Sequence, residues 1–259
     1  MTSIKEALAL GERGVVSITG AGGKTSLMYS LAQELVAAGK KVLTTTTTKI
    51  FPPTQKESPA TIVSRFSEEI IEKAEALLNR HSHLTVASDY LQDCHKLNGL
   101  EPSAIEHILH TNLFDFIIIE ADGAARRSLK ASAPHEPVVP PFSDRVVAMV
   151  GLDVVAKPLT EEWVFRSSIF SRITGLDLLQ NVTESSIASA IIHDMSSISV
   201  TGQESMKIAF LNKADNLKAR QAGVRITALI EKSGKNIFHR IVIGTLRPEP
   251  FIHTCKTLP

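Results

Sequence analysis

The amino-acid sequence predicts an α/β protein built on a doubly wound, mostly parallel sheet with helices on both faces. β-rich apolar segments alternate along the chain with segments of helical periodicity, which is the pattern of repeated βαβ units. The most apolar segment, residues 113–123 (LFDFIIIEADG), is hydrophobic for most of its length, as expected for a strand covered on both faces. A glycine-rich turn joins the first predicted strand to the first long helix.

The N-terminal elements form the first βαβ unit. A short helix is expected over residues 4–10, and the β-branched run at 15–19 predicts a buried strand. Residues 25–38 carry apolar side chains at helical spacing, and Gly39 provides a C-terminal stop. Residues 41–47 are again β-rich. This strand–turn–helix–strand order implies a right-handed crossover within one parallel sheet.

The remaining elements continue the alternation within a single domain that spans residues 1–259, without a linker or internal repeat. Helical patterns also occur at about 161–194, and this segment is expected to form a lid or a helical subdomain. The sequence predicts helices at 66–82, 101–112 and 217–232, and strands at 83–90, 113–123, 144–153, 205–216 and 236–246, the last of which is expected to be the final strand.

Composition narrows the class of protein. The chain has 259 residues with 43% hydrophobic content, which suffices for a large core, and its formal net charge of +1 argues against a nucleic-acid partner. Its two cysteines form no C-x-x-C pair and fit a reducing compartment. The charged N-terminus does not resemble a signal peptide, and no apolar run is long enough to span a membrane. We therefore expect a cytoplasmic protein with no membrane partner.

The turn after the first strand, in ITGAGGKTS, has the features of a phosphate-binding loop. Glycines let the backbone curl so that N–H groups converge on an anion at a helix N-terminus. The common pattern G-x-x-x-x-G-K-[ST] needs glycine where Ile18 stands, so the loop is a shortened P-loop that resembles the loop of the Mur ligases. The alternative is a structural glycine turn. The predicted nucleotide-binding residues here are Gly20, Ala21, Gly22, Gly23, Lys24, Thr25 and Ser26.

Two of these side chains have specific predicted roles. Lys24 is placed to reach the β- and γ-phosphates, and we expect it to be exposed in the absence of a ligand. The Thr25 hydroxyl is placed to bind Mg²⁺. The second predicted magnesium ligand is Glu120, in the strand that ends in Glu120 and Asp122, since a Walker B acid at such a strand end holds Mg²⁺ or polarises water. We assign Glu120 and Asp122 as catalytic candidates; the alternative is a solvated strand end.

Three further features of the sequence leave two interpretations open. The five threonines at 44–48 indicate either strand positions or hydroxyls that face the phosphates. Four cationic candidates follow the acidic strand end, where they either neutralise phosphate charge or form a solvated loop: Arg126, Arg127, Lys130 and His135.

The third feature is the segment LNKADN. Its Asn212, Lys213 and Asp215 resemble the N-K-x-D motif that recognises guanine, in which one carboxylate pairs with two adjacent donors of the base. The alternative is that Asp215 or Asn216 caps the following helix. The nucleotide is therefore expected to be ATP or GTP, with Mg²⁺.

Several longer motifs together resemble the YqeC family. They are ITGAGGKTSLM, TTTTTKIFPP, IIEADGAARRSLKASAPHEPVVP and GLDVVAKPLTEEWVFR, and they cover residues 14–174. The chain departs from the family pattern at Ser128, where proline is expected. The resemblance implies a P-loop-type nucleotide-binding accessory factor for maturation of a selenium-dependent molybdenum hydroxylase. Its expected partners are the nucleotide and that hydroxylase or its cofactor intermediate.

Three functions are compatible with these features. The first is a nucleoside triphosphatase that acts as a maturation factor. The second is a ligase or kinase that uses the γ-phosphate to activate a small acceptor, as the Mur-like loop suggests. The third is a non-catalytic binding module. Phosphate release without an acceptor would indicate the triphosphatase, and phosphate release that requires an acceptor would indicate the ligase or kinase. Absence of nucleotide binding would indicate the binding module.

Overall fold

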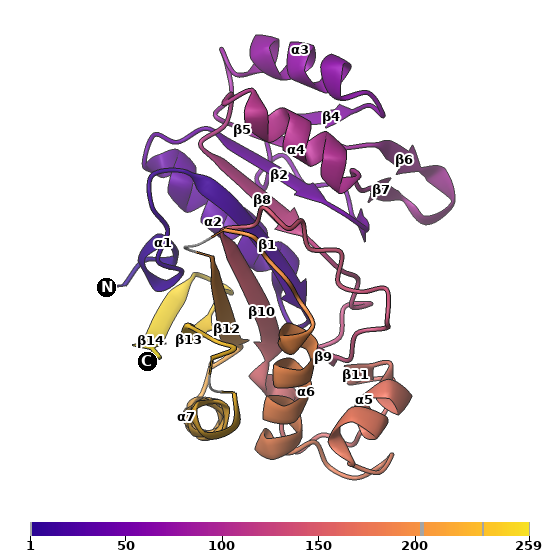
Figure 1. Ribbon diagram of the computed structural model, residues 1–259, viewed down its shortest axis with the longest axis vertical. Helices are drawn as coiled ribbons and strands as arrows, with labels where there is room; N and C mark the ends of the chain where they lie inside the picture. The colour runs from indigo at the N-terminus through magenta and orange to yellow at the C-terminus, as the bar shows by residue number, and fades with distance from the viewer. Residues whose placement is uncertain (1, 203–204, 235, 259) are drawn as a thin grey trace.

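The computed structural model describes residues 2–202, 205–234 and 236–258. In this part of the chain, nine strands form one sheet in the order β14-β13-β12-β10-β1-β8-β2-β5-β4 (Figure 1). All neighbours are parallel except β13 and β14. The strands are β1 Gly14–Gly20, β2 Val42–Thr46, β4 Thr61–Val63, β5 His83–Ala87, β8 Phe116–Glu120, β10 Arg145–Gly151, β12 Met206–Asn212, β13 Arg240–Thr245 and β14 Phe251–Thr257.

The strand order reverses around β1. From β1 the chain moves outward to β2, β4 and β5, returns to β8 beside β1, and then crosses to β10 on its other side. Ligands of open α/β sheets bind at the carboxyl ends of the strands at such a switch point. The predicted phosphate loop leaves the carboxyl end of β1 and therefore lies at this position.

Helices cover both faces of the sheet, because successive side chains of each buried strand point to opposite faces. Val16 and Ile18 of β1 pack with α1 (Ile4–Ala7) and α2 (Lys24–Ala37). Val15 packs on the opposite face, beneath α3 (Ser67–Leu77) and α4 (Pro102–His110). Strands β10 and β12 continue this second face beneath α5 (Ser167–Thr174), α6 (Glu184–Ser196) and α7 (Leu217–Ser233). The predicted doubly wound α/β class is confirmed.

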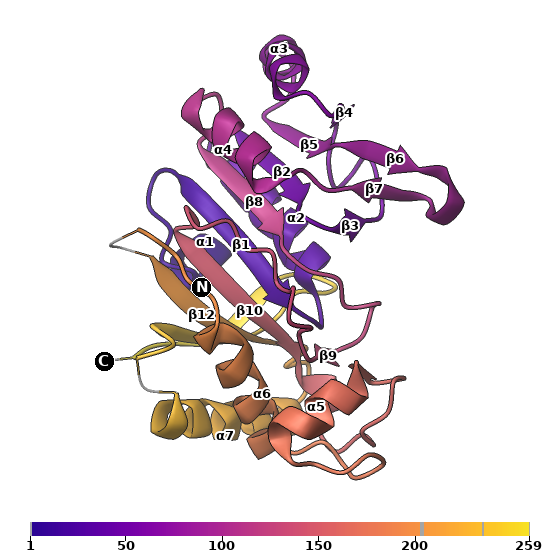
Figure 2. The ribbon, with the colours of Figure 1, turned by 45° about the vertical axis from the view of Figure 1, so that its right-hand side comes forward.

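The segment 161–194 contains α5 and most of α6, and both helices lie at the same end of the molecule as α7 (Figures 1 and 2). Phe170 of α5 and Ile187 of α6 are fully buried in the cluster that also contains Leu211 of β12. These two helices thus share the hydrophobic core of the sheet. No helix in the described ranges combines the length and apolarity needed to cross a membrane.

The structure differs from the predicted elements in three places. The expected strand 83–90 divides, because β5 ends at Ala87 and β6 (Asp89–Leu91) pairs in a separate small sheet with β7 (Lys96–Asn98) and β3 (Lys49–Ile50). This small sheet projects beside β5 (Figure 2). Strand β9 (Leu129–Lys130) pairs with β11 (Val164–Phe165). The expectation that 236–246 holds the final strand is wrong, since β14 follows and pairs antiparallel with β13.

Phe210 tests the contribution of the sheet core to stability. Its ring is fully buried in the cluster between the sheet and α2. Replacement by alanine removes this burial and leaves a cavity, so we expect Phe210→Ala to lower the free energy of unfolding by about 3–5 kcal/mol. Urea denaturation measures the change. Phe66→Ala is the matched control because Phe66 is 69% exposed, and it should change stability by less than about 1 kcal/mol. Equal losses in both variants would contradict the assignment.

Candidate functional site

The loop between β1 and α2 contains three glycines with positive φ angles, Gly20, Gly22 and Gly23, and the first two approach the backbone of β10 closely. Gly20 and Gly22 have φ angles of +85° and +82°, which side-chain-bearing residues rarely adopt. A Cβ atom on Gly22 would lie 2.2 Å from the Gly151 nitrogen, and one on Gly20 would lie 2.4 Å from the Met149 carbonyl oxygen. The loop therefore packs directly against the backbone at the end of β10, and this close approach fixes its path.

The N–H groups of the loop divide into two sets. Gly20 donates to Asp122, Ala21 donates to the Met149 carbonyl and Gly22 donates to the Arg127 carbonyl, at 2.9, 2.9 and 3.0 Å. The next donors belong to the first turn of α2, which starts after Gly23. The N–H groups of Lys24, Thr25 and Ser26 have no acceptor among the described residues. Free donors and a positive dipole end make this helix start suitable for an anion.

Lys24 is buried, contrary to the expectation that it is exposed. Its side chain is 4% exposed, and its Nζ donates to the Gly20 carbonyl at 2.8 Å. The same nitrogen lies 3.1 Å from Asp122 Oδ1 and 3.7 Å from Glu120 Oε1. Burial alone would lower the pKa of Lys24, but the charges of Asp122 and Glu120 outweigh burial and raise this pKa. The ammonium group thus stays charged and is held by two carboxylates.

Glu120 and Thr25 meet beside this lysine. Thr25 Oγ1 donates a hydrogen bond to Glu120 Oε2 at 2.7 Å, and Glu120 is the last residue of β8. Burial raises the pKa of Glu120 above its ordinary value, although the Lys24 charge and the Thr25 hydrogen bond oppose that rise. A carboxylate with a raised pKa is better able to accept a proton near neutral pH. The pair also places two hard oxygen donors at the cavity wall.

Asp122 has a different environment from Glu120. It is fully buried, it does not line the cavity, and its Oδ2 accepts from Thr19 Oγ1 at 2.7 Å and from Lys130 Nζ at 2.9 Å. Lys130 in turn donates to Glu136 at 2.6 Å, and Glu136 accepts two hydrogen bonds from the Arg166 guanidinium. Asp122 therefore anchors a chain of buried and partly buried charges that runs from the loop to β9 and to Arg166, which follows β11.

The N-K-x-D residues lie at the carboxyl end of β12, at the same edge of the sheet as the loop, and their environments differ. Asn212 Nδ2 donates to the Gly22 carbonyl at 2.7 Å. Lys213 lines the cavity and donates to Ser128 Oγ at 2.7 Å and to Asp153 Oδ2 at 2.8 Å. Asp215 is exposed and lies outside the cavity lining, and Asn216 caps α7. The motif thus combines a loop contact, a cavity side chain and a surface carboxylate.

The hydroxyl groups of the threonine run form hydrogen bonds within the protein. Thr45 donates to the Val86 carbonyl at 2.8 Å, Thr46 to the Glu120 carbonyl at 2.6 Å and Thr47 to the Val138 carbonyl at 2.9 Å. None of the five threonines lines the cavity described below. Their hydroxyls stabilise the carboxyl end of β2 against its neighbours, and Thr46 supports the backbone of Glu120.

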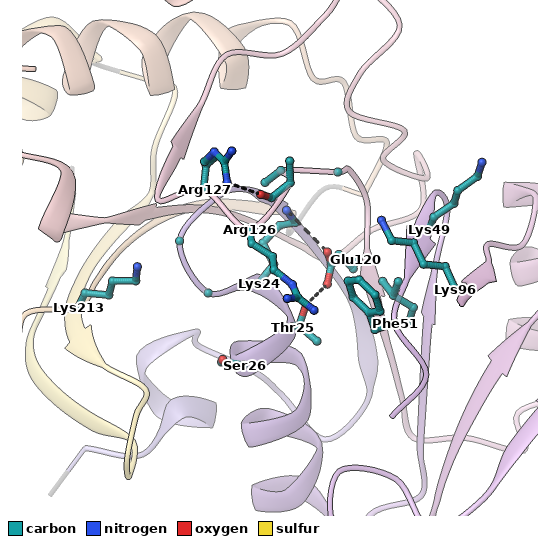
Figure 3. Close-up of a pocket in the computed structure, with 16 residues that line it drawn as sticks. Lys24, Thr25, Ser26, Lys49, Phe51, Lys96, Glu120, Arg126, Arg127 and Lys213 are labelled. Atoms are coloured by element: carbon teal, nitrogen blue, oxygen red, sulfur yellow. Dashed lines mark hydrogen bonds and ion pairs between the residues drawn. The ribbon is translucent and has the colours of Figure 1, made fainter. Parts of the chain in front are cut away.

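A cavity of about 520 Å³ opens over the loop (Figure 3). Glu120 is the acidic side chain in a lining that is otherwise rich in cations. Figure 3 shows Lys213 on one side of Lys24, Thr25 and Glu120, and Lys49 and Lys96 on the other. The lining residues are Gly22, Gly23, Lys24, Thr25, Ser26, Lys49, Ile50, Phe51, Lys96, Glu120, Gly123, Ala124, Ala125, Arg126, Arg127 and Lys213.

Some of these cavity residues were not predicted. Lys49 and Phe51 lie within the motif TTTTTKIFPP. The motif does not reveal that their segment, which forms part of the small sheet, lies beside the phosphate loop. Lys96 has no motif at all, and it reaches the cavity because β7 pairs with β3. Among the four cationic candidates, Arg126 and Arg127 line the cavity, Lys130 is buried in the charge chain, and His135 lies outside the cavity lining.

Comparison with known proteins identifies the family. The profile of the YqeC protein family matches residues 16–168. The chain belongs to the YqeC family. It is 29% identical over 243 residues to the protein YqeC of Escherichia coli (strain K12), and the alignment covers 92% of this chain and 90% of that protein. The family match includes the loop, Glu120 and the charge chain through Arg166, and it ends before the N-K-x-D segment.

A comparison with solved structures finds distant likenesses, FtsY among them. FtsY from Mycoplasma mycoides superposes on this YqeC-family chain with a TM-score of 0.32 and 9% sequence identity. The likeness covers 91% of this chain and 54% of FtsY, so the chain spans about half the length of that protein. An overlap this weak carries no information on function.

Glu136 makes the charge chain testable by pH. Burial alone would raise the pKa of Glu136, but Arg166 and Lys130 outweigh burial and hold the pKa at about 2. Because this folded-state pKa is depressed, the stabilisation by Glu136 is present above the unfolded-state pKa of about 4.5 and is lost as the pH falls toward 2. We expect Glu136→Gln to lower the free energy of unfolding at pH 7, with a difference from wild type that shrinks below pH 4.5.

Urea denaturation at pH 7, 4 and 3 measures this difference. Glu72→Gln is the matched control, because Glu72 is an exposed carboxyl on α3, and it should change the free energy of unfolding by less than about 0.5 kcal/mol at each pH. A Glu136→Gln difference that stays constant over this pH range would show that the carboxylate charge does not stabilise the fold.

Proposed function

We propose that this protein binds a nucleoside triphosphate at the β1–α2 loop and cleaves its γ-phosphate, as an accessory factor in maturation of a selenium-dependent molybdenum hydroxylase. The observation that carries the nucleotide proposal is the convergence of Lys24, Thr25 and Glu120 at one helix N-terminus, at the switch point of the sheet. The maturation role rests on the motifs shared with the YqeC family.

The phosphates are placed at the free N–H groups of α2. Gly20, Ala21 and Gly22 hold the curve of the loop through their own hydrogen bonds, and Gly23 to Ser26 face the anion. Lys24 neutralises the terminal phosphates, with its ammonium group moving from the Gly20 carbonyl toward the ligand. Because Asp122 retains Lys130 as a partner at 2.9 Å, this movement does not leave the buried carboxylate without a counter-charge.

Glu120 is the proposed general base and Asp122 the positioning residue. Glu120 borders the cavity and has a raised pKa, so it is suited to take a proton from water or from the hydroxyl of an acceptor. Asp122 is removed from the cavity and fixes Thr19, Gly20 and Lys24. The two carboxylates assigned together from the sequence therefore have separate proposed roles.

The residues fit a magnesium ion bound together with phosphates. Mg²⁺ prefers oxygen ligands and is held in such sites by few protein groups plus phosphate and water. Thr25 and Glu120 supply one hydroxyl and one carboxylate in contact with each other. No cluster of three His, Cys, Asp or Glu side chains within residues 2–202, 205–234 and 236–258 offers an all-protein cage. A bound Mg²⁺ would stabilise the charge that develops on the phosphoryl oxygens.

A ligase or kinase is the second candidate function. The cationic side chains at the far end of the cavity from Lys213 support it, because an anionic acceptor would be held beside the terminal phosphate. Phosphate release that requires an added acceptor would identify this activity. Phosphate release from the nucleotide without any added acceptor would identify a triphosphatase.

Lys24→Ala tests nucleotide binding. We expect the variant to lose on the order of 10- to 100-fold in affinity for the Mg²⁺ nucleotide, since a charge-assisted contact with phosphate is removed. Isothermal titration calorimetry with ATP and GTP measures the affinity. The variant should also be less stable, because Glu120 and Asp122 lose a buried counter-charge, so binding is measured at a temperature where circular dichroism shows the folded state.

The matched control is Lys232→Ala, which removes a lysine from the exposed end of α7 and should leave the affinity unchanged. Wild-type affinity in folded Lys24→Ala would remove the P-loop assignment and leave a structural glycine turn.

The base preference depends on Asp215. If its exposed carboxylate pairs with the two donors of guanine, GTP should bind at least about tenfold more tightly than ATP, because adenine leaves these groups unpaired. Asp215→Ala should abolish that preference by weakening GTP binding while ATP binding stays unchanged. Calorimetry with both nucleotides on both proteins measures this. Equal affinities of the wild type for GTP and ATP would show that Asp215 does not bind the base, and only the phosphate-binding half of the site would remain supported.

A further inference from the structure

The cavity extends past the phosphate loop to a separate group of cations. We use the term outer cation cluster for Lys49, Lys96 and Arg126, which line the cavity together with Phe51. Lys96 and Arg126 lie over the ring of Phe51. Lys49 belongs to β3, Lys96 to β7, and Arg126 to the loop that follows β8. Three segments far apart in the chain thus bring positive charge to one end of one cavity.

The outer cation cluster lacks acidic partners. Among the residues that the structure describes, no hydrogen bond or ion pair joins Lys49, Lys96 or Arg126 to a carboxylate. Two of the three contact the ring of Phe51, whose centroid lies 4.4 Å from Arg126 Cζ and 5.0 Å from Lys96 Nζ. Phe51 itself is 44% exposed. Like charges gathered without counter-charge repel one another, and they concentrate anions in a cleft.

The other cations of the cavity are already engaged. Lys24 contacts Asp122 and Glu120, and Lys213 forms an ion pair with Asp153 at 2.8 Å. Arg127 Nε donates to the Glu161 carbonyl at 2.6 Å. Among the described cavity residues, Lys49, Lys96 and Arg126 are therefore the cations that neither a protein hydrogen bond nor an ion pair holds.

The position of the cluster separates it from the base side of the proposed nucleotide site. Lys213 follows β12, which lies two strands from β1 on one side, whereas Lys49 follows β2, two strands away on the other. Figure 3 shows Lys24 and Glu120 between these two ends. A nucleotide with its base near Lys213 and its phosphates on the loop would therefore have its terminal phosphate toward the cluster.

The backbone that carries Arg126 is held in an unusual conformation. Ala125 and Arg126 have φ angles of +45° and +60°, and neither is glycine. Consecutive non-glycine residues in the left-handed region are costly and tend to occur at ligand sites. Here this conformation places the guanidinium over Phe51.

We propose that the outer cation cluster binds a second anionic ligand, a small molecule that carries a carboxylate or a phosphate, beside the terminal phosphate of the nucleotide. The adjacency to the nucleotide rests on the proposed function, whereas the anion site itself rests on the unpaired cations. The second ligand is held by Lys49, Lys96 and Arg126, and Phe51 forms the wall that orients Lys96 and Arg126.

Two probe anions test the proposal on the full chain. The loop is first saturated with a non-hydrolysable triphosphate analogue and Mg²⁺, and the protein is then titrated with citrate or with inorganic pyrophosphate by calorimetry. We expect at least one probe to bind the analogue complex. Binding by citrate alone identifies a carboxylate ligand, and binding by pyrophosphate alone identifies a phosphate ligand. Lys49→Ala/Lys96→Ala should weaken probe binding at least tenfold while changing affinity for the analogue by less than threefold.

The matched control is Lys218→Ala/Lys232→Ala, which removes two exposed charges from α7 and should preserve probe binding. Absence of probe binding, or equal weakening by both double variants, would overturn the second site. A tenfold loss of analogue affinity in Lys49→Ala/Lys96→Ala would also overturn it, because these lysines would then belong to the triphosphate. Failure of the analogue to bind wild-type protein would instead overturn the proposed function. In that case the probes are titrated into the ligand-free Lys24→Ala protein. Probe binding there would support the anion site, and absence of probe binding would overturn it.

Discussion

The carboxylate of Asp122 is the constraint on which the candidate site depends. It is fully buried, so it requires hydrogen-bond donors and positive charge in its immediate surroundings. These come from the end of β1 through Thr19 and the Gly20 N–H, from α2 through Lys24, and from β9 through Lys130. One carboxylate therefore fixes the exit of the strand, the start of the helix and the segment that follows β8.

The charges around Asp122 balance. Lys24, Lys130 and Arg166 face Glu120, Asp122 and Glu136, so three cations and three carboxylates form a connected and formally neutral group. Neutrality offsets the cost of placing two lysine side chains in the interior, where an unpaired charge is strongly unfavourable. It also links the loop to β11 and α5, since Arg166 precedes α5 and follows Phe165 of β11. The long family motif EADGAARRSLKASAPHEP contains most of this chain of charges.

The sequence was sufficient to predict the central sheet, because strands buried on both faces have long apolar runs and the intervening helices have clear periodicity. It did not predict β14, whose polar side chains reflect an antiparallel edge strand with an exposed face. The small sheet of β3, β6 and β7 was also missed, since strands of two or three residues leave almost no periodic signal.

The site was predictable only in part, for a physical reason. Spacing places Glu120 and Asp122 at the end of β8, and residues two apart in a strand point to the same face. Because β8 ends at Glu120, Asp122 lies beyond the strand, and the strand pattern does not say where its side chain points. Nor does it show that Lys24 is buried against both carboxylates, because that depends on a fold-wide arrangement of charges. The position of Lys96 at the cavity could not be predicted for the same reason, because it depends on the pairing of β7 with β3.

Gly22 forms backbone hydrogen bonds toward both ends of the cavity. Its carbonyl accepts from Asn212 on the side of β12, and its N–H donates to the carbonyl of Arg127, the neighbour of Arg126. No side chain fits at this position, because a Cβ would meet the Gly151 nitrogen at 2.2 Å. A displacement of this peptide therefore has to move the segment that carries Arg126, or the segment that carries Lys213, or both. The loop that would hold an anion is in this way hydrogen-bonded to Asn212 on the base side and to the backbone of Arg127, the residue after Arg126 of the outer cation cluster.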